Sequence, residues 1–178
     1  DGVGPDVSAA ARQVLNAVAD KHGHTFSYHE ALIGGAAIDE TGDPLPPETV
    51  DKCQASDAVL LGAVGGPKWS DPNAKIRPEQ GLLKIRSVLG VYANIRPVKI
   101  YSELTGASPL KRKILEGVDM LVIRELTGGI YLGKKTRTDT SASDLCEYTV
   151  PEIERIVRFA ATLAGGRRGK LCSVDKAN

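Results

Sequence analysis

Residues 58–69 read Ala-Val-Leu-Leu-Gly-Ala-Val-Gly-Gly-Pro-Lys-Trp, and this stretch decides the expected fold. Its first four residues are apolar without alternation, which is typical of a strand buried on both faces of a parallel sheet. A Gly- and Pro-rich loop follows and extends to Pro78. Because open α/β sheets bind ligands beyond the carboxyl ends of their strands, this loop is a candidate ligand site.

The glycines of the loop would let a ligand approach the backbone closely. The loop matches neither the dinucleotide fingerprint G-x-G-x-x-G nor the phosphate loop that ends in Gly-Lys-Ser/Thr, and Gly2-Val3-Gly4-Pro5 matches neither of them. On pattern alone, a surface loop that needs glycine for its turns explains the stretch equally well.

Helices and strands alternate along the chain. Apolar spacing predicts five helices: from Pro5 to just before His22, and over residues 47–55, 82–89, 110–115 and 151–164. Alternation or short apolar runs predict strands at residues 26–29, 58–61, 91–95, 120–123 and 170–174. The order indicates an α/β layer fold, with residues 1–91 in a first lobe and residues 92–178 in a second.

A polar segment interrupts the second lobe at residues 134–147, and its charged residues resemble neither a core helix nor a core strand. It is interpreted as a protruding arm. The chain begins without Met and ends just after an expected strand, so both ends are interpreted as cuts through larger elements, and the fold as incomplete.

Composition limits the possible functions. Of 178 residues, 42% are hydrophobic and 25% charged, and the net charge is +1. These values are typical of a soluble globular protein without an overall field that attracts nucleic acid or an acidic membrane. Cys53, Cys146 and Cys172 are too widely spaced for a disulfide framework or a zinc ribbon, which favours a reducing compartment. No membrane span or signal peptide is expected.

Three arginines lie on or beside expected elements, namely Arg86, Arg96 and Arg124. A guanidinium fork matches a carboxylate in two hydrogen bonds, so converging arginines would hold a di- or tricarboxylate. Internal salt bridges, or long side chains that reach solvent, explain the same residues without a ligand.

Two further residues are candidates for proton transfer. Tyr131 follows the pair Gly128-Gly129, where a sharp turn would direct its side chain into a cleft, although it also fits a half-buried packing residue. Lys176 ends an apolar strand, where desolvation would lower its pKa and make it a usable base. A lysine at a strand end is also explained as a solvated rim charge.

Taken together, these segments resemble the β-decarboxylating dehydrogenases of the isocitrate/isopropylmalate dehydrogenase family. The matching stretches occur in the family's order and cover the chain from end to end: residues 1–7, 62–69, 78–86, 92–97, 122–133 and 174–178. The resemblance implies the two-lobed fold of that family, which is not the Rossmann fold, with residues 1–91 in the larger, cofactor-side lobe and residues 92–178 in the second, dimerisation lobe. It also implies oxidative decarboxylation of a 2-hydroxy dicarboxylate, with the isopropylmalate reaction of leucine biosynthesis as the expected activity.

The resemblance also assigns roles to residues. It implies that Arg86, Arg96 and Arg124 clamp the substrate's carboxylates. Tyr131 is implied as the general acid, and Lys176 as the group that handles the proton of the 2-hydroxyl across a dimer interface. The residues implied to contact NAD are Gly65, Gly66, Pro67, Lys68, Trp69, Pro78, Glu79 and Asn178.

Substrate choice is expected to depend on Leu82 and Leu83. A branched aliphatic side chain needs an apolar wall, whereas isocitrate enzymes of the family use hydroxyl-bearing residues near this position. Core packing is the alternative explanation for the leucines. The rival activities are homoisocitrate, isocitrate or tartrate oxidation, and a non-catalytic regulatory relative is the rival of a different class.

The remaining expectations rest on the family. NAD is the expected cofactor, and Mg²⁺ or Mn²⁺ is expected to bind through residues beyond position 178. The partners are expected to be a small substrate and a second copy of the chain, held through the arm, with no nucleic acid and no membrane. A cytoplasmic location is expected, and an organelle is the alternative.

Overall fold

The structure is a computed structural model that describes residues 1–71 and 73–174. The chain divides into two compact units, unit 1 over residues 1–90 and unit 2 over residues 91–178. The assignment of unit 1 to a cofactor-side lobe and of unit 2 to a dimerisation lobe stays a prediction.

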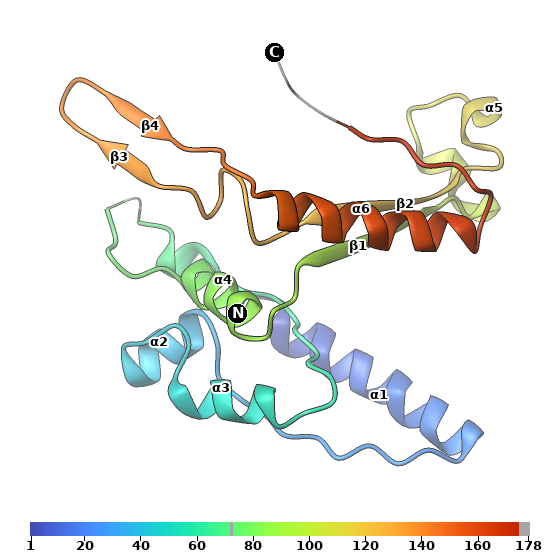
Figure 1. Cartoon of the computed structure of the whole chain (residues 1–178). Coiled ribbons are helices and arrows are strands. Elements are labelled where there is room, and N and C mark those ends of the chain that lie inside the picture. The colour runs from blue at the N-terminus through green and yellow to red at the C-terminus, as the bar shows by residue number, and fades with distance from the viewer. Residues whose placement is uncertain (72, 175–178) are drawn as a thin grey trace. The chain divides into compact units, whose positions relative to one another are not determined.

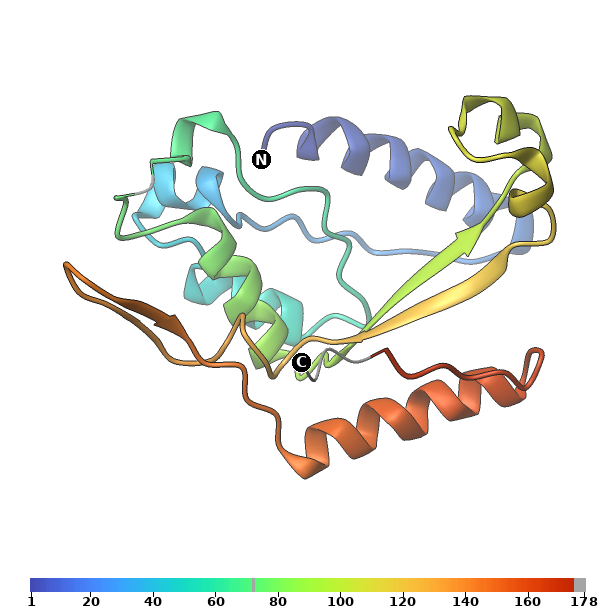
Figure 2. The ribbon, with the colours of Figure 1, turned by 90° about the horizontal axis from the view of Figure 1, so that it is seen from above.

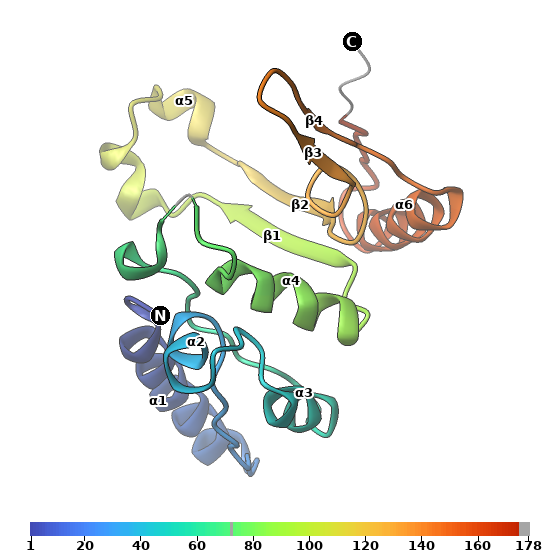
Figure 3. The same ribbon diagram turned by 90° about the vertical axis from the view of Figure 1, so that its left-hand side faces the viewer.

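Unit 1 consists of helices joined by irregular segments (Figures 1 and 3). A proline lies in the first turn of four of the helices, where its missing N–H costs no hydrogen bond. The elements are α1 (Gly4–His22), α2 (Gly35–Thr41), α3 (Pro47–Gln54), the 3₁₀ helix η1 (Pro67–Trp69) and α4 (Pro78–Val88).

In the described chain, residues 26–29 and 58–61 form no strand, because neither segment pairs with another strand. The prediction of strands at these two segments is therefore wrong. Val59 and Leu60 are 47% and 56% exposed, so the run is not buried on either face as expected. An apolar run becomes a central strand only when neighbours pair with it and helices cover it. Residues 26–29 are held instead by Tyr28, whose hydroxyl donates to Asn16 of α1 at 2.9 Å.

The packing of unit 1 is tightest around residues 44–45. Leu45 is fully buried, and the Pro44 carbonyl accepts a hydrogen bond from Gly34 N–H at 2.8 Å. Gly81 of α4 lies so close to this carbonyl that a Cβ on Gly81 would stand 2.3 Å from the oxygen. The absence of a side chain at Gly81 therefore lets α4 pack on this turn.

Unit 2 is built on an antiparallel pair of strands. Strand β1 (Ala93–Lys99) pairs along its whole length with β2 (Asp119–Glu125), and the connection between them contains η2 (Ser102–Ala107) and α5 (Arg112–Leu115). This connection holds only short helices and leads back antiparallel, whereas a parallel neighbour requires a full crossover. Residues 170–174, expected as a strand, have no strand partner among the described residues.

Helix α6 (Val150–Gly165) runs alongside the β1–β2 ribbon and contacts β2 (Figure 2). Its start follows from the sequence, because Thr149 and Glu152 form a capping box and Pro151 occupies the first turn. At the other end of β2, Arg167 pairs with Asp119 at 2.7 Å. The helix is thus attached near both ends of the strand.

The polar segment forms a hairpin of β3 (Lys135–Arg137) and β4 (Ala142–Asp144), which extends away from the ribbon (Figure 2). Every residue of the two strands is exposed. Lys135 and Asp144 pair across the strands at 2.9 Å.

In the described part of the chain, no helix is both long and apolar enough to cross a membrane.

The contact of Gly81 yields a stability prediction. Gly81→Ala forces a methyl group against a backbone carbonyl, so we expect it to lower the free energy of unfolding by about 1–3 kcal/mol. The control is Gly165→Ala in α6, where a Cβ meets nothing within 4 Å and alanine favours the helix. Chemical unfolding followed by circular dichroism measures both. Equal effects of the two substitutions would contradict the packing described for α4.

Candidate active site

Arg96 and Arg124 lie on the same face of the β1–β2 ribbon. Arg124 is directly opposite Asn94, and Asn94 is two residues from Arg96 on β1. Side chains two apart on a strand, and those directly opposite each other, share a face. The Arg96 Nε donates to the Asn94 Oδ1 at 2.6 Å, so Asn94 orients one of the two guanidinium groups.

The structure places Tyr131 beside Arg124. The Arg124 guanidinium lies over the tyrosine ring, 4.7 Å from its centroid. The tyrosine is 60% exposed, so the expectation of a half-buried packing residue does not hold. A guanidinium and a phenol hydroxyl are thereby presented together to solvent at the end of β2.

The turn of residues 126–133 brings Tyr131 to this place, and it depends on glycine. Gly129 has a φ of +79°, a conformation that other residues rarely adopt. The Tyr148 side chain packs against the backbone of Gly128 and Gly129. A Cβ added to Gly128 would stand 2.8 Å from the Tyr148 ring, and a Cβ added to Gly129 would stand 2.3 Å from the Tyr148 hydroxyl oxygen. The turn closes with a 2.9 Å hydrogen bond from Gly133 N–H to the Gly129 carbonyl.

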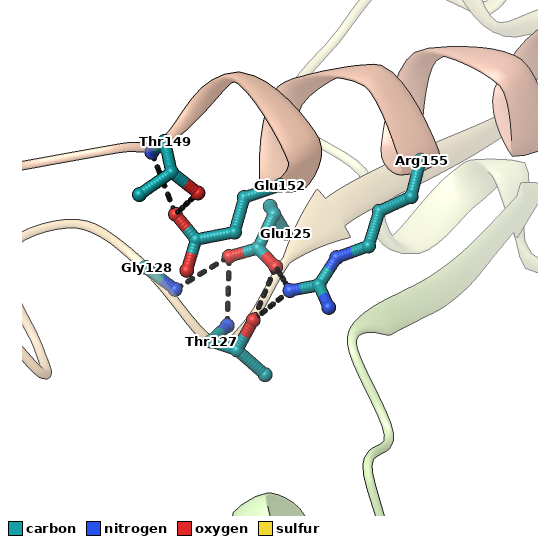
Figure 4. A network of polar contacts seen from close by, with 6 residues as sticks. All are labelled: Glu125, Thr127, Gly128, Thr149, Glu152 and Arg155. Carbon is teal, nitrogen blue, oxygen red and sulfur yellow. Dashed lines mark hydrogen bonds and ion pairs between the residues drawn. The ribbon is translucent and has the colours of Figure 1, made fainter.

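The carboxylate of Glu125 fixes the start of that turn (Figure 4). Its Oε2 accepts hydrogen bonds from the N–H groups of Thr127 and Gly128, both at 2.7 Å. Its Oε1 accepts from the Thr127 hydroxyl and from an Arg155 nitrogen, again both at 2.7 Å. The Glu125 side chain is only 9% exposed, so a nearly buried negative charge is satisfied on both of its oxygens.

Arg155 reaches Glu125 from α6 and is itself held by aromatic rings. Its guanidinium lies 4.6 Å from the centroid of the Tyr92 ring, and Phe159 meets that ring edge-on. Arg155 also donates to the Thr127 hydroxyl. Glu152, one helical turn before Arg155, accepts from the N–H and the hydroxyl of Thr149. The helix and the turn are thus tied together through charged groups.

The candidate substrate-binding residues of unit 1 lie on α4. Pro78, Gly81 and Ile85 form its buried side, whereas Leu82, Leu83 and Arg86 are half-buried. Helical spacing of three and four residues places Glu79, Leu82, Leu83 and Arg86 in one stripe next to the buried side. Full burial in the core, the alternative explanation for the leucines, is therefore not what the structure shows.

The loop before α4 is shaped by carboxylates. The Asp1 side chain accepts hydrogen bonds from Gly35 N–H at 2.5 Å, Ala36 N–H at 2.8 Å and Gly65 N–H at 3.0 Å. Gly65 has a φ of +96°, and a Cβ there would stand 2.8 Å from the Glu79 carboxylate. The structure therefore brings Glu79 against Gly65, two residues implied to contact NAD.

The end of the same loop is fixed by Asp39 of α2. Asp39 accepts from the Lys68 ammonium at 2.6 Å and from the Trp69 indole N–H at 3.2 Å. The hydrogen bond from Lys68 is the largest influence on Asp39 and lowers its pKa. The Trp69 ring also covers Gly35, while Pro67 and Lys68 remain exposed. The loop thus keeps an accessible surface on a fixed backbone.

The structure brings some of the predicted residues together and leaves others apart. Arg96, Arg124 and Tyr131 share unit 2, whereas Arg86 and the expected NAD-binding loop belong to unit 1. None of the three arginines forms an ion pair within the described residues, so internal salt bridges do not explain them there. Lys176 and Asn178 lie outside the described residues.

Sequence reasoning assigned no role to Asp1, Asp39, Glu125 or Arg155. Arg155 lies one turn after the Thr149–Glu152 capping box, but nothing in the sequence links it to Glu125, which is 30 positions earlier. In the described part of the chain, no group of three or more His, Cys, Asp or Glu side chains is arranged to hold a metal ion. The residues expected to bind metal lie beyond position 178.

Comparison with known proteins decides the family. Residues 1–178 match the family described as isocitrate/isopropylmalate dehydrogenase. The chain belongs to the isocitrate/isopropylmalate dehydrogenase family. In general, this family depends on NAD and on Mg²⁺ or Mn²⁺.

Curated members of the family are similar along the whole chain. A 3-isopropylmalate dehydrogenase of Rhodopirellula baltica is 55% identical over 182 residues, which cover 100% of this chain and 51% of that protein. One of Bacillus licheniformis is 52% identical over 184 residues, covering 100% of this chain and 50% of the relative. The chain therefore spans about half the length of the curated relatives that it matches.

Solved structures confirm the expected isopropylmalate dehydrogenase-like fold. A β-decarboxylating dehydrogenase of Thermococcus kodakarensis is 31% identical with a TM-score of 0.62, covering 94% of this chain and 44% of that one. An isocitrate dehydrogenase of Methylococcus capsulatus is 26% identical with a TM-score of 0.75, covering 96% and 47%.

The bonds of Glu125 make unit 2 sensitive to acid. Burial raises the pKa of the Glu125 carboxyl, but the hydrogen bonds from Thr127, Gly128 and Arg155 together outweigh it and hold the pKa below its ordinary value of 4.5. A depressed pKa stabilises the fold above pH 4.5, and this stabilisation is lost as pH falls through the lower, folded-state pKa.

We therefore expect Glu125→Gln to lower the free energy of unfolding by about 2 kcal/mol at pH 7, and the difference from wild type to shrink below pH 4.5. Urea unfolding at a series of pH values measures this. Glu154→Gln removes an exposed partner of Arg158 on the same helix and serves as the control. A difference that stays constant down to pH 3 would contradict the depressed pKa.

Proposed function

We propose that the chain forms part of a 3-isopropylmalate dehydrogenase, which oxidises and decarboxylates 3-isopropylmalate to 4-methyl-2-oxopentanoate with reduction of NAD, in leucine biosynthesis. One observation carries the proposal: Arg124 lies over Tyr131, on the same ribbon face as Arg96, and neither arginine has a carboxylate partner among the described residues. The curated relatives that bear this name support the choice of activity.

The arginines account for substrate binding. Each guanidinium can donate two parallel hydrogen bonds to a carboxylate, and a 2-hydroxy dicarboxylate supplies two such groups. Arg96 and Arg124 are diagonal neighbours across the ribbon, so one small dianion can contact both. Arg86 is also proposed to bind a substrate carboxylate.

Tyr131 and Lys176 account for the movement of protons. Lys176 receives the proton of the 2-hydroxyl while the hydride leaves the same carbon. After the β-carboxylate departs as carbon dioxide, the Tyr131 hydroxyl donates a proton to the carbon that has lost it. The exposure of Tyr131 leaves its hydroxyl accessible to a substrate held by Arg124.

The cofactors supply what side chains cannot. When bound, NAD accepts the hydride, and Mg²⁺ or Mn²⁺ polarises the oxygen at the reacting carbon. In unit 1, the residues proposed to hold the nicotinamide end of NAD are Gly65, Gly66, Pro67, Lys68, Trp69, Pro78 and Glu79, with Asn178 beyond the described residues. The accessible loop surface held by Asp1 and Asp39 fits this role.

Substrate choice and assembly complete the proposal. Leu82 and Leu83 lie one helical turn before Arg86 on α4 and offer an apolar wall to the isopropyl group. The exposed β3–β4 hairpin is the proposed contact with the second copy in a homodimer, because an exposed two-stranded ribbon can pair or pack with its equivalent. A cytoplasmic location agrees with this activity and stays a proposal.

Two pairs of residues, Leu82 with Leu83 and Tyr131 with Lys176, argue against the two alternatives. Oxidation of homoisocitrate, isocitrate or tartrate would need polar groups for a different substrate side chain, whereas this chain has Leu82 and Leu83. A non-catalytic relative would not need the acid and the base, yet Tyr131 and Lys176 are both present. Isopropylmalate oxidation is therefore favoured over both.

The test uses a complete enzyme in which this chain replaces the aligned stretch of the Rhodopirellula baltica relative, called the hybrid enzyme below. We expect it to reduce NAD with 3-isopropylmalate and Mg²⁺. Tyr131→Phe should lower kcat about 100-fold, which is typical for the loss of a general acid. The increase in NADH absorbance, followed at a series of substrate concentrations, gives kcat for the unsubstituted hybrid enzyme and for the Tyr131→Phe variant.

Tyr101→Phe is the matched control, because Tyr101 lies in the same unit and is also 60% exposed. Its kcat should equal that of the unsubstituted hybrid enzyme. A folded hybrid enzyme that turns over isocitrate, homoisocitrate or tartrate but not isopropylmalate would contradict the proposed substrate. Failure with all four substrates would favour the non-catalytic alternative.

A further inference from the structure

We propose that Glu125, paired with Arg155, is a positioning residue that fixes the turn of residues 126–133 and thereby the place of the Tyr131 hydroxyl. The inference rests on the proposed function for the role of Tyr131, whereas the geometry that supports it is independent of any substrate. Glu125 itself does not touch the substrate in this account.

The alternation of strand β2 separates Glu125 from the substrate side. Arg124 and Glu125 are consecutive residues of β2, so their side chains point to opposite faces of the ribbon. Arg124 shares its face with Arg96, whereas Glu125 is turned toward α6 and Arg155 (Figure 4). Any influence of Glu125 on the reaction must therefore pass through the backbone.

The backbone that Glu125 holds leads directly to Tyr131. Its carboxylate binds the N–H groups of Thr127 and Gly128 at the start of the turn. Gly129 N–H donates to the Glu147 carbonyl at 2.8 Å in the middle, and Gly133 N–H closes the turn. Tyr131 lies between the last two anchors. Its own ring is 60% exposed and contacts Arg124, so its position is set by the turn.

Arg155 makes the position of Glu125 rigid. The arginine is fixed to α6 and to the rings of Tyr92 and Phe159, and it contacts both Glu125 and Thr127. Its Nε is buried and has no hydrogen-bond partner among the residues that the structure describes, so the guanidinium depends on these few contacts. Neutralising Glu125 removes the charge that holds Arg155 and weakens the acceptor of the turn, because an amide side chain cannot accept on both ends.

The first measurement is amide hydrogen exchange in the hybrid enzyme without substrate. In Glu125→Gln, we expect the amides of Thr127 and Gly128 to exchange about tenfold faster, since their acceptor is weakened. The amides of Val98 and Met120, a hydrogen-bonded pair of the β1–β2 ladder, should still exchange far more slowly than those of the turn, which separates a local effect from general unfolding. Glu154→Gln is the control. Unchanged exchange at Thr127 and Gly128 would overturn the inference whatever the activity.

The second measurement is a double-mutant cycle on kcat with 3-isopropylmalate. If Glu125 acts through Tyr131, Glu125→Gln should lower kcat about tenfold alone and less than twofold in the Tyr131→Phe background. If the role of Glu125 were purely structural, the reductions in kcat caused by Glu125→Gln and by Tyr131→Phe would multiply in the double variant. That outcome would overturn the inference. Absence of turnover in the unsubstituted hybrid enzyme would overturn the proposed function instead, while hydrogen exchange would still decide the role of Glu125.

A second variant covers the case in which Glu125→Gln fails to fold. Thr127→Val removes one hydroxyl between Glu125 and Arg155 but keeps the charge pair and both N–H bonds. Thr127→Val should lower kcat about threefold in the otherwise unsubstituted hybrid enzyme and should leave kcat unchanged in the Tyr131→Phe background. An equal loss in both backgrounds would overturn the inference.

Discussion

The arrangement of unit 2 depends on one nearly buried carboxylate, that of Glu125. A buried charge is costly unless it is paired and hydrogen-bonded, and both Glu125 oxygens are satisfied by Arg155 and the start of a turn. The same contacts join α6 to the end of β2. Because β2 also carries Arg124, the bond that attaches the helix also fixes the residues that are proposed to bind and protonate the substrate.

Unit 1 uses a similar arrangement around Asp1. Its carboxylate collects N–H groups from the start of α2 and from Gly65, so one short side chain joins three segments that are far apart in the sequence. Asp39 then holds the end of the same loop through Lys68 and Trp69. In both units, a carboxylate that fixes the backbone lies next to residues with a proposed chemical role. The residues that hold the backbone are therefore different from those proposed to contact the substrate or the cofactor.

The sequence predicted local structure better than pairing. The helices after Pro5, Pro47, Pro78 and Thr149 could be located, because their caps and spacing are local signals. The strands expected at residues 26–29, 58–61 and 170–174 were wrong, since an apolar run forms a strand only where a neighbour pairs with it. The family was predicted correctly from motifs, but Glu125 and Arg155 were missed, because a contact between residues 30 positions apart leaves no periodic signal.

Arg96, Arg124 and Tyr131 are proposed to face one substrate at the end of the β1–β2 ribbon. A crystal structure of the hybrid enzyme with 3-isopropylmalate and Mg²⁺ would show whether they do. We expect a substrate carboxylate within hydrogen-bond distance of both guanidinium groups, with the Tyr131 hydroxyl beside the reacting carbons and the Glu125 network intact. Substrate bound away from this face, or Tyr131 turned away from it, would rule out this arrangement.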